Sequence, residues 1–112
     1  MGDNFFVRLC QKAGINIDPR IIAVIYLLSN VKREEIIDHV TSGRILFDEL
    51  FEISTCWSYK EQQFIRVAAA LYPSSKFDIV VDKLFNYLNR EERALVLTAL
   101  NIYYQVIREN KD

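Results

Sequence analysis

Residues 89–110 read NREERALVLTALNIYYQVIREN, and we expect the rest of the chain to be organised around this stretch. Asn89 followed by Glu92 three residues later is typical of a capping box, which predicts a helix that begins just after Asn89. No Gly or Pro interrupts the segment before Asn110. The sequence therefore predicts one long C-terminal helix.

The apolar side chains of this helix are unusually widely distributed around its axis. At about 100° per residue they cover an arc of roughly 220°, about twice the stripe that a helix needs to lie on a core. The residues in the arc are Leu95, Val96, Leu97, Ala99, Leu100, Ile102, Tyr103, Tyr104, Val106 and Ile107. We therefore expect a mostly buried helix, either surrounded by the other helices or shared with a second copy of the chain.

The length and composition indicate one helical domain, residues 1–112. The chain has 26% charged residues and only three Gly and two Pro, which favours helices over a sheet with many turns. A net charge of −1 gives no general attraction to nucleic acid or an anionic membrane. Two cysteines and no signal peptide predict the reducing cytoplasm, with Cys10 and Cys56 as small core residues. The longest apolar run, Ile21–Leu28, is shorter than the roughly 20 residues needed to span a membrane.

We predict an all-α fold, a compact bundle of about six helices, some of them short. Asp3 should cap the first helix and Gly14 should end it, while Asp18 and Pro19 should begin the second. The second helix has an uninterrupted apolar run and should be buried on most sides. The predicted helical segments before Asn89 are 3–13, 18–29, 32–39, 44–53, 58–72 and 75–88.

Two further features concern the middle of the chain. Ser58 with Glu61 and Ser75 with Asp78 are capping boxes, and Pro73 should end the helix that starts at Ser58. The segment 54–57, which reads STCW, has the least regular pattern. We predict an exposed loop there.

The sequence contains no recognisable catalytic, cofactor-binding or metal-binding motif, and we predict that the protein is not an enzyme. His39 is the only histidine, and no nucleophile is placed near it by any motif. Two scattered cysteines and one histidine lack the spacing of metal ligands. The adjacent carboxylates Glu34-Glu35, Asp48-Glu49 and Glu91-Glu92 are expected to be surface pairs, two of them favourable in first helical turns.

A small DNA-binding transcriptional regulator is the alternative. Residues 20–40 can be drawn as a helix, a turn and a second helix. However, the segment in the recognition position, KREEIIDHV, carries acids beside its bases, and no helix combines a basic row with Asn or Gln to read base edges. Nucleic acid is therefore not the expected partner.

Association with another protein is the remaining class of function. Aromatic residues and Arg anchor protein interfaces when they are exposed, although we expect most of the aromatic side chains to fill the core. The predicted interface candidates are Trp57, Tyr59, Arg66, Tyr72, Leu97, Leu100, Tyr103, Tyr104 and Ile107. A homodimer through the C-terminal helix is a second expectation.

Three segments and one tryptophan together carry a family resemblance. They are IAVIYLLS (22–29), Trp57, IRVAAALY (65–72) and FDIVVDKLFNYLNREERALVLTALNIYY (77–104). This arrangement resembles a family of small uncharacterised all-helical proteins encoded by phages and prophages of Gram-positive bacteria, while 44–55 departs from its pattern. The resemblance implies an accessory protein that binds a host bacterial protein, such as a defence component, and modulates or inhibits it in the host cytoplasm.

Overall fold

The protein is an all-α bundle with a small two-stranded sheet in its described part, so the predicted fold class is confirmed. The structure is a computed structural model that describes residues 4–14, 18–72, 85–86 and 88–109, with only the backbone of 105–109. The predicted helix over 75–88 lies largely outside these residues, as does the hairpin that it would form with the last helix.

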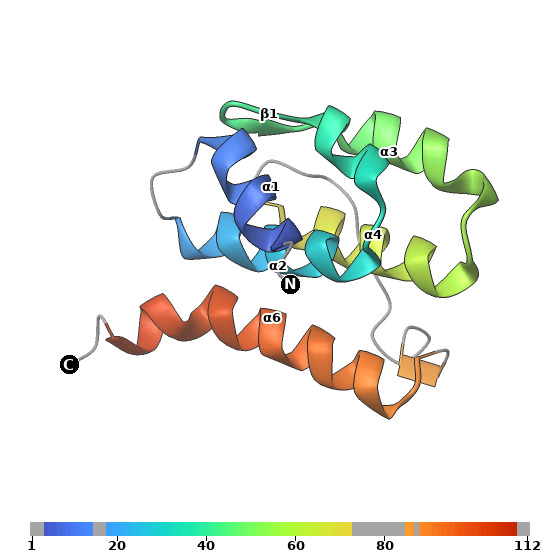
Figure 1. The fold of residues 1–112 in the computed structure, drawn as a ribbon. Helices are drawn as coiled ribbons and strands as arrows, with labels where there is room; N and C mark the ends of the chain where they lie inside the picture. Colours follow the sequence, from blue (N-terminus) through green and yellow to red (C-terminus); the bar gives the residue numbers. More distant parts are fainter. Residues whose placement is uncertain (1–3, 15–17, 73–84, 87, 110–112) are drawn as a thin grey trace.

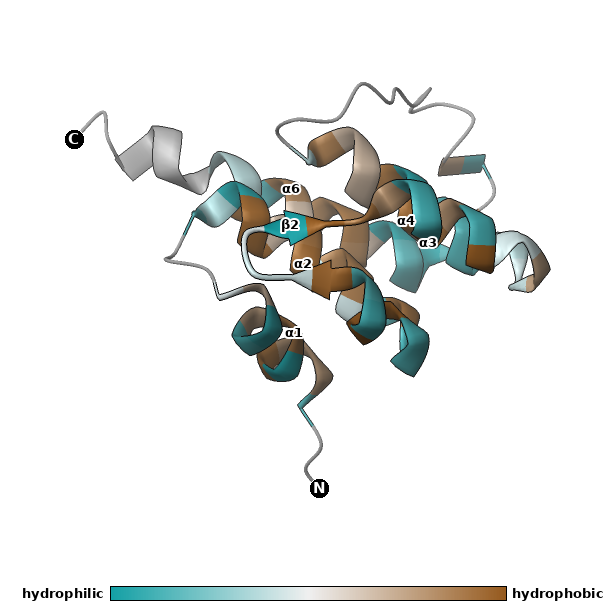
Figure 2. Ribbon diagram, turned by 90° about the horizontal axis from the view of Figure 1, so that it is seen from above, coloured by the Kyte–Doolittle hydropathy of each residue, from teal (hydrophilic) through white to brown (hydrophobic). Residues whose placement is uncertain are grey.

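Helix α2 (Pro19–Val31) is the centre of the bundle. It contacts α4 (Tyr59–Leu71) and α6 (Arg90–Glu109) more extensively than any other two elements contact each other. Figure 1 shows α6 along one side of α2, with α1 (Phe5–Ala13) and the small sheet on the other side. The hydropathy colouring shows hydrophobic residues on the inner helices and hydrophilic residues on the outward turns (Figure 2). The uninterrupted apolar run therefore makes α2, rather than α6, the surrounded helix.

The ends of the first two helices follow from local chemistry. Asp18 accepts a hydrogen bond from the backbone N–H of Arg20 at 3.0 Å and Pro19 is the first helical residue, as predicted. Gly14 ends α1 in the left-handed region at φ 62°. The predicted cap Asp3 is wrong, because Asn4 is the N-cap and its side chain accepts from the N–H of Val7 at 3.2 Å.

The segment after α2 differs from the predicted pair of short helices. A 3₁₀ helix, η1 (Glu34–His39), leads into strand β1 (Val40–Thr41), which pairs antiparallel with β2 (Arg44–Ile45). Gly43 occupies the turn at φ 78°, where a residue with a Cβ would be strained. The predicted helix over 44–53 therefore begins only at Phe47 as α3 (Phe47–Ile53), since its first residues complete the hairpin.

The predicted exposed loop at 54–57 is also wrong. Residues Ser54–Cys56 form a 3₁₀ helix, η2, and Trp57 is buried in the main core. Both halves of the capping box that begins α4 are present, since Ser58 N–H donates to Glu61 at 3.0 Å and Glu61 N–H donates to the Ser58 hydroxyl at 3.2 Å. The turn formed by η2 therefore directs the Trp57 side chain into the core just before α4 begins.

Helix α6 begins as predicted but is less buried than predicted. The backbone N–H of Asn89 donates to Glu92 at 2.8 Å, and the N–H of Glu92 donates to the Asn89 side chain at 2.8 Å. Among the described side chains of α6, only Val96 and Ala99 are fully buried. The expectation that the other helices surround α6 is wrong, because α6 lies at the edge of the bundle.

Candidate functional site

The side of α6 that packs on α2 is narrow. Val96 is 2% exposed and Ala99 is fully buried, and they lie close together on one side of the helix. Partly buried apolar residues border this side, namely Leu95, Leu100, Ile102 and Tyr103. A contact of this width uses only part of the apolar arc, and Leu97 and Tyr104 lie outside it and face solvent.

Leu97 and Tyr104 are the large apolar side chains that α6 exposes among its described residues. Leu97 is 54% exposed and Tyr104 is 51% exposed. They are seven residues apart, which places them two turns or about 10 Å apart along the same side of the helix. The ring of Tyr104 also lies 4.8 Å from that of Tyr103 at 64°, an edge-to-face contact that orients both rings. We call the side of α6 formed by Arg90, Arg93, Leu97 and Tyr104 the outer face.

Arginines occupy the N-terminal half of the outer face. Arg93 lies one turn before Leu97 and Arg90 lies two turns before it, and both side chains are exposed. The Nε–H of Arg93 donates to the backbone carbonyl of Phe85 at 2.8 Å, which holds the guanidinium beside the helix. Sequence reasoning did not select these two residues, although basic residues in the first turn of a helix oppose its dipole and are a usable signal.

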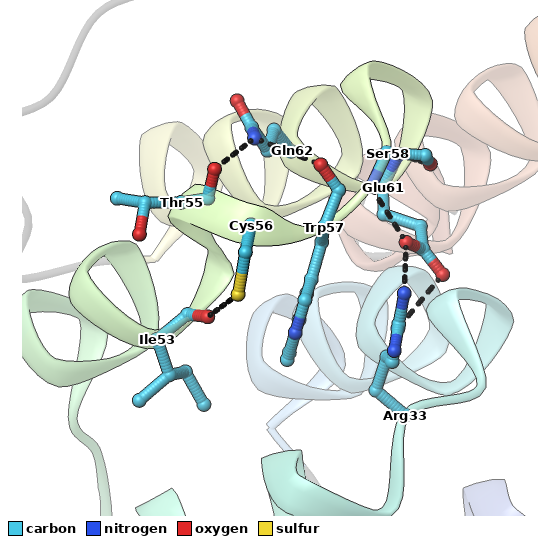
Figure 3. A network of polar contacts seen from close by, with 8 residues as sticks. All are labelled: Arg33, Ile53, Thr55, Cys56, Trp57, Ser58, Glu61 and Gln62. Atoms are coloured by element: carbon cyan, nitrogen blue, oxygen red, sulfur yellow. Dashed lines mark hydrogen bonds and ion pairs between the residues drawn. The ribbon is translucent and has the colours of Figure 1, made fainter.

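Trp57 does not contribute an exposed surface. Only 8% of the residue is accessible, and its ring lies in the hydrophobic core. The guanidinium of Arg33 stacks 5.0 Å from the ring centre and also donates to Glu61 through Nε at 3.0 Å and Nη2 at 2.9 Å. Figure 3 shows this network, in which Gln62 also donates to the Trp57 carbonyl at 3.1 Å. Trp57 therefore fixes the α3–α4 corner to the end of α2.

The pKa of Glu61 is lowered by the hydrogen bonds from Arg33 and by those from Ser58, although partial burial opposes the shift. The charged form of Glu61 is therefore favoured by the fold. This network has a structural role, because its donors and acceptors bond to one another across elements.

The remaining predicted interface residues are dispersed. Tyr72 is half-buried, its ring lies 5.3 Å from that of Phe47, and its hydroxyl accepts from the N–H of Ile45 at 3.2 Å. Tyr59, at the start of α4, is 51% exposed, and Arg66 is exposed on the same helix. The structure thus brings Leu97 and Tyr104 together on α6, with Leu100 and Tyr103 at their borders. The Ile107 side chain lies outside the described residues.

The ionisable groups of the described part form surface contacts. His39 Nδ1 lies 2.9 Å from a carboxylate oxygen of Glu49, which connects η1 to α3.

The two cysteines lie in different environments. Cys56 is exposed, so its predicted place in the core is wrong. Cys10 is half-buried, and this burial raises the pKa of its thiol. Within the described ranges no three His, Cys, Asp or Glu side chains gather as metal ligands would.

The geometry of residues 20–40 gives the DNA-binding alternative no support. The element in the recognition position is the six-residue 3₁₀ helix η1 instead of an α-helix. The nearby arginines are already paired, Arg20 with Asp18 and Arg33 with Glu61. The segment as folded therefore lacks the recognition α-helix of a major-groove reader.

In the part of the chain that the structure describes, none of the helices is sufficiently long and apolar to cross a bilayer. Comparisons of the chain with protein-family models, with curated proteins and with solved structures found no match.

Proposed function

We propose that the protein is a non-enzymatic binding module that recognises another protein through the outer face of α6. The observation that carries this proposal is the exposure of Leu97 and Tyr104 on one side of a helix whose opposite side packs on α2. Removing exposed apolar surface from water is favourable by about 25 cal/mol for each Å² that a partner covers. A second protein surface that covered Leu97 and Tyr104 would be stabilised on α6 in this way.

The composition of the outer face fits a small interface of this kind. Binding energy in protein complexes concentrates in a few residues, and Tyr and Arg are over-represented among them. Tyr104 supplies an aromatic ring already oriented by Tyr103, and Arg93 supplies a guanidinium held by the Phe85 carbonyl. Side chains that are already ordered lose less entropy when a partner binds.

The setting that we propose is a bacterial cell that carries a phage or prophage. The family resemblance of 22–29, Trp57, 65–72 and 77–104 supports this setting. In it, the protein binds a host bacterial protein in the cytoplasm and modulates it, with inhibition of a defence component as the proposed outcome. The contact is made by α6, whereas Trp57 serves the fold.

Capture from a Gram-positive bacterial lysate tests the proposed function. Immobilised wild type, Leu97→Glu, Tyr104→Ser and Thr98→Glu would be compared by quantitative mass spectrometry. Thr98 is exposed on α6 about 100° away from Leu97 around the axis, so Thr98→Glu controls for added charge on the helix. We expect at least one protein to be retained by wild type and Thr98→Glu and lost from the other two. Equal capture by all four would refute a role for the outer face.

Self-association through the same surface is the second candidate, because a second copy could also cover the exposed Leu97 and Tyr104. Sedimentation equilibrium of wild type and Leu97→Glu distinguishes the two. A homodimer predicts that the wild type dimerises in the micromolar range and that the variant is monomeric. A monomeric wild type at 100-fold higher concentration would leave the heterologous partner.

A further inference from the structure

We infer that the outer face of α6 binds a protein segment that combines apolar side chains with a carboxylate. This inference rests on the proposed function and specifies the chemistry of its partner. The apolar side chains of the partner would cover Leu97 and Tyr104. Its carboxylate would bind Arg93, which lies four residues, or about 6 Å along the helix axis, before Leu97.

Arg93 has the geometry of a preorganised carboxylate receptor. Its Nε–H is used by the Phe85 carbonyl at 2.8 Å, so the guanidinium plane is held at one edge. Within the described residues the two terminal nitrogens, Nη1 and Nη2, donate no hydrogen bond, and they form the end that binds a carboxylate through two parallel hydrogen bonds. Such bonds fix the angle as well as the position of the partner.

The charge of Arg90 and Arg93 is not neutralised by an ion pair anywhere in the described part of the chain. Arg8, Arg20 and Arg33 differ, since each is paired with a carboxylate, whereas exposed Arg44 and Arg66 also lack an ion pair among the described residues. Helix stability does not explain the two positions either, because a cation at the start of a helix faces the positive end of its dipole. As far as the described residues are concerned, both charges are thus available to a ligand beside Leu97 and Tyr104.

The same charges disfavour a second copy of the chain as the occupant. A parallel pair of outer faces would place Arg93 against its own equivalent. An antiparallel pair that sets Leu97 against Tyr104 would bring position 93 opposite position 108, which is also an arginine in the sequence. Like charges across an interface cost free energy and suppress the wrong partner. The complementary surface is therefore a different, acidic one.

Selection from a displayed peptide library tests this inference. The library would present a helical scaffold randomised on one face, and it would be selected separately on wild type and on Arg90→Glu/Arg93→Glu. Wild type should enrich peptides that carry Asp or Glu next to Leu, Ile or Phe, and the charge-reversed variant should enrich Lys or Arg at the same place. Circular dichroism and thermal melts would confirm that the variant is folded.

The selected peptides then allow a quantitative measurement. Fluorescence anisotropy of the best acidic peptide should show affinity about tenfold weaker for Arg93→Gln, because one charge-assisted pair is lost. Arg66→Gln is the matched control, since Arg66 is an exposed arginine on α4 instead of α6. Raising the salt concentration should weaken binding to wild type more than binding to Arg93→Gln. An equal loss in Arg66→Gln would overturn the assignment to Arg93.

The outcomes separate the two proposals. Peptides that require Leu97 and Tyr104 but show no enrichment of Asp or Glu would overturn the acidic partner and leave the binding function intact. Selection of no peptide that depends on Leu97 or Tyr104 would count against both. Binding to vesicles of phosphatidylcholine with 30% phosphatidylserine, lost in Leu97→Glu and Arg93→Gln without any acidic peptide selected, would replace the protein partner with a membrane surface.

Discussion

The guanidinium of Arg33 lies 5.0 Å from the centre of the Trp57 ring while its Nε and Nη2 bond to Glu61. One side chain at the end of α2 thereby holds both the corner after η2 and the first turn of α4. The ring fills core volume, and the Arg33 guanidinium lies beside it and bonds to the Glu61 carboxylate (Figure 3). An interface candidate in the sequence is thus a structural residue in the fold.

Trp57→Ala should lower the free energy of unfolding by about 3 kcal/mol, since it empties a buried aromatic site and removes the partner of the Arg33 cation. Urea denaturation followed by circular dichroism would measure the loss. Tyr59→Ala is the comparison, because Tyr59 is half exposed two residues away and should cost clearly less. Equal losses in the two variants would contradict the burial of Trp57.

The ionisation of Glu61 should make the free energy of unfolding depend on pH. Its pKa is lowered in the folded protein, chiefly by the hydrogen bonds from Arg33, relative to about 4.3 in an unfolded chain. A lowered pKa adds stability above the unfolded value, and that contribution is lost as the pH falls through the folded value. The difference in unfolding free energy between wild type and Glu61→Gln should therefore be constant from pH 7 to pH 5 and shrink below about pH 4. A difference that grew on acidification would contradict the sign of the shift.

Lys32 should tolerate, and benefit from, replacement by glycine. It ends α2 in the left-handed region at φ 61° and ψ 41°, which costs a residue with a Cβ about 1 kcal/mol. Lys32→Gly should raise the free energy of unfolding by about that amount, measured by thermal and urea denaturation. Arg66→Gly, on the exposed side of the middle of α4, should have the opposite sign, because glycine in a helix interior is destabilising.

The orientation of α6 predicts contrasting effects for neighbouring residues. Val96→Ala removes buried methyl groups and should destabilise the protein by about 1 to 2 kcal/mol, whereas Leu97→Ala should change stability by no more than about 0.5 kcal/mol. Ala99→Leu should also destabilise, because it overfills the contact with α2. Paired urea titrations would test all three. A larger cost at Leu97 than at Val96 would mean that α6 packs through its outer face.

The sequence predicted best those features that depend on a few adjacent residues. The caps at Asp18, Ser58 and Asn89 were identified because a side chain and a backbone N–H three or fewer residues apart satisfy each other. The hairpin over 40–45 was missed for the converse reason. Each strand has only two residues, too few for an alternating pattern, and the hairpin is also held by Gly43 N–H donating to the Ala13 carbonyl at 2.8 Å.

The candidate site was predicted in part. The wide apolar arc pointed to α6 as the candidate surface, but its width could not tell which apolar residues a neighbour would cover. That depends on α2, whose run of apolar residues already contacts α1 and α4. Trp57 could not be assigned to the core from its neighbours either, because its partner Arg33 lies 24 positions earlier in the sequence. Arg93 was not among the predicted residues, because its hydrogen bond to the Phe85 carbonyl forms only in the folded chain.

The attachment of α6 at the edge of the bundle has a consequence for how a bound partner could be detected. Its main contact within the described fold is with a single helix, α2. Fraying of α6 from this support would expose its amides to deuterium while α2 and α4 stay protected. A ligand that clamps the free side would slow deuterium uptake along this one helix, and mass spectrometry of its peptides would report occupancy before the ligand is identified.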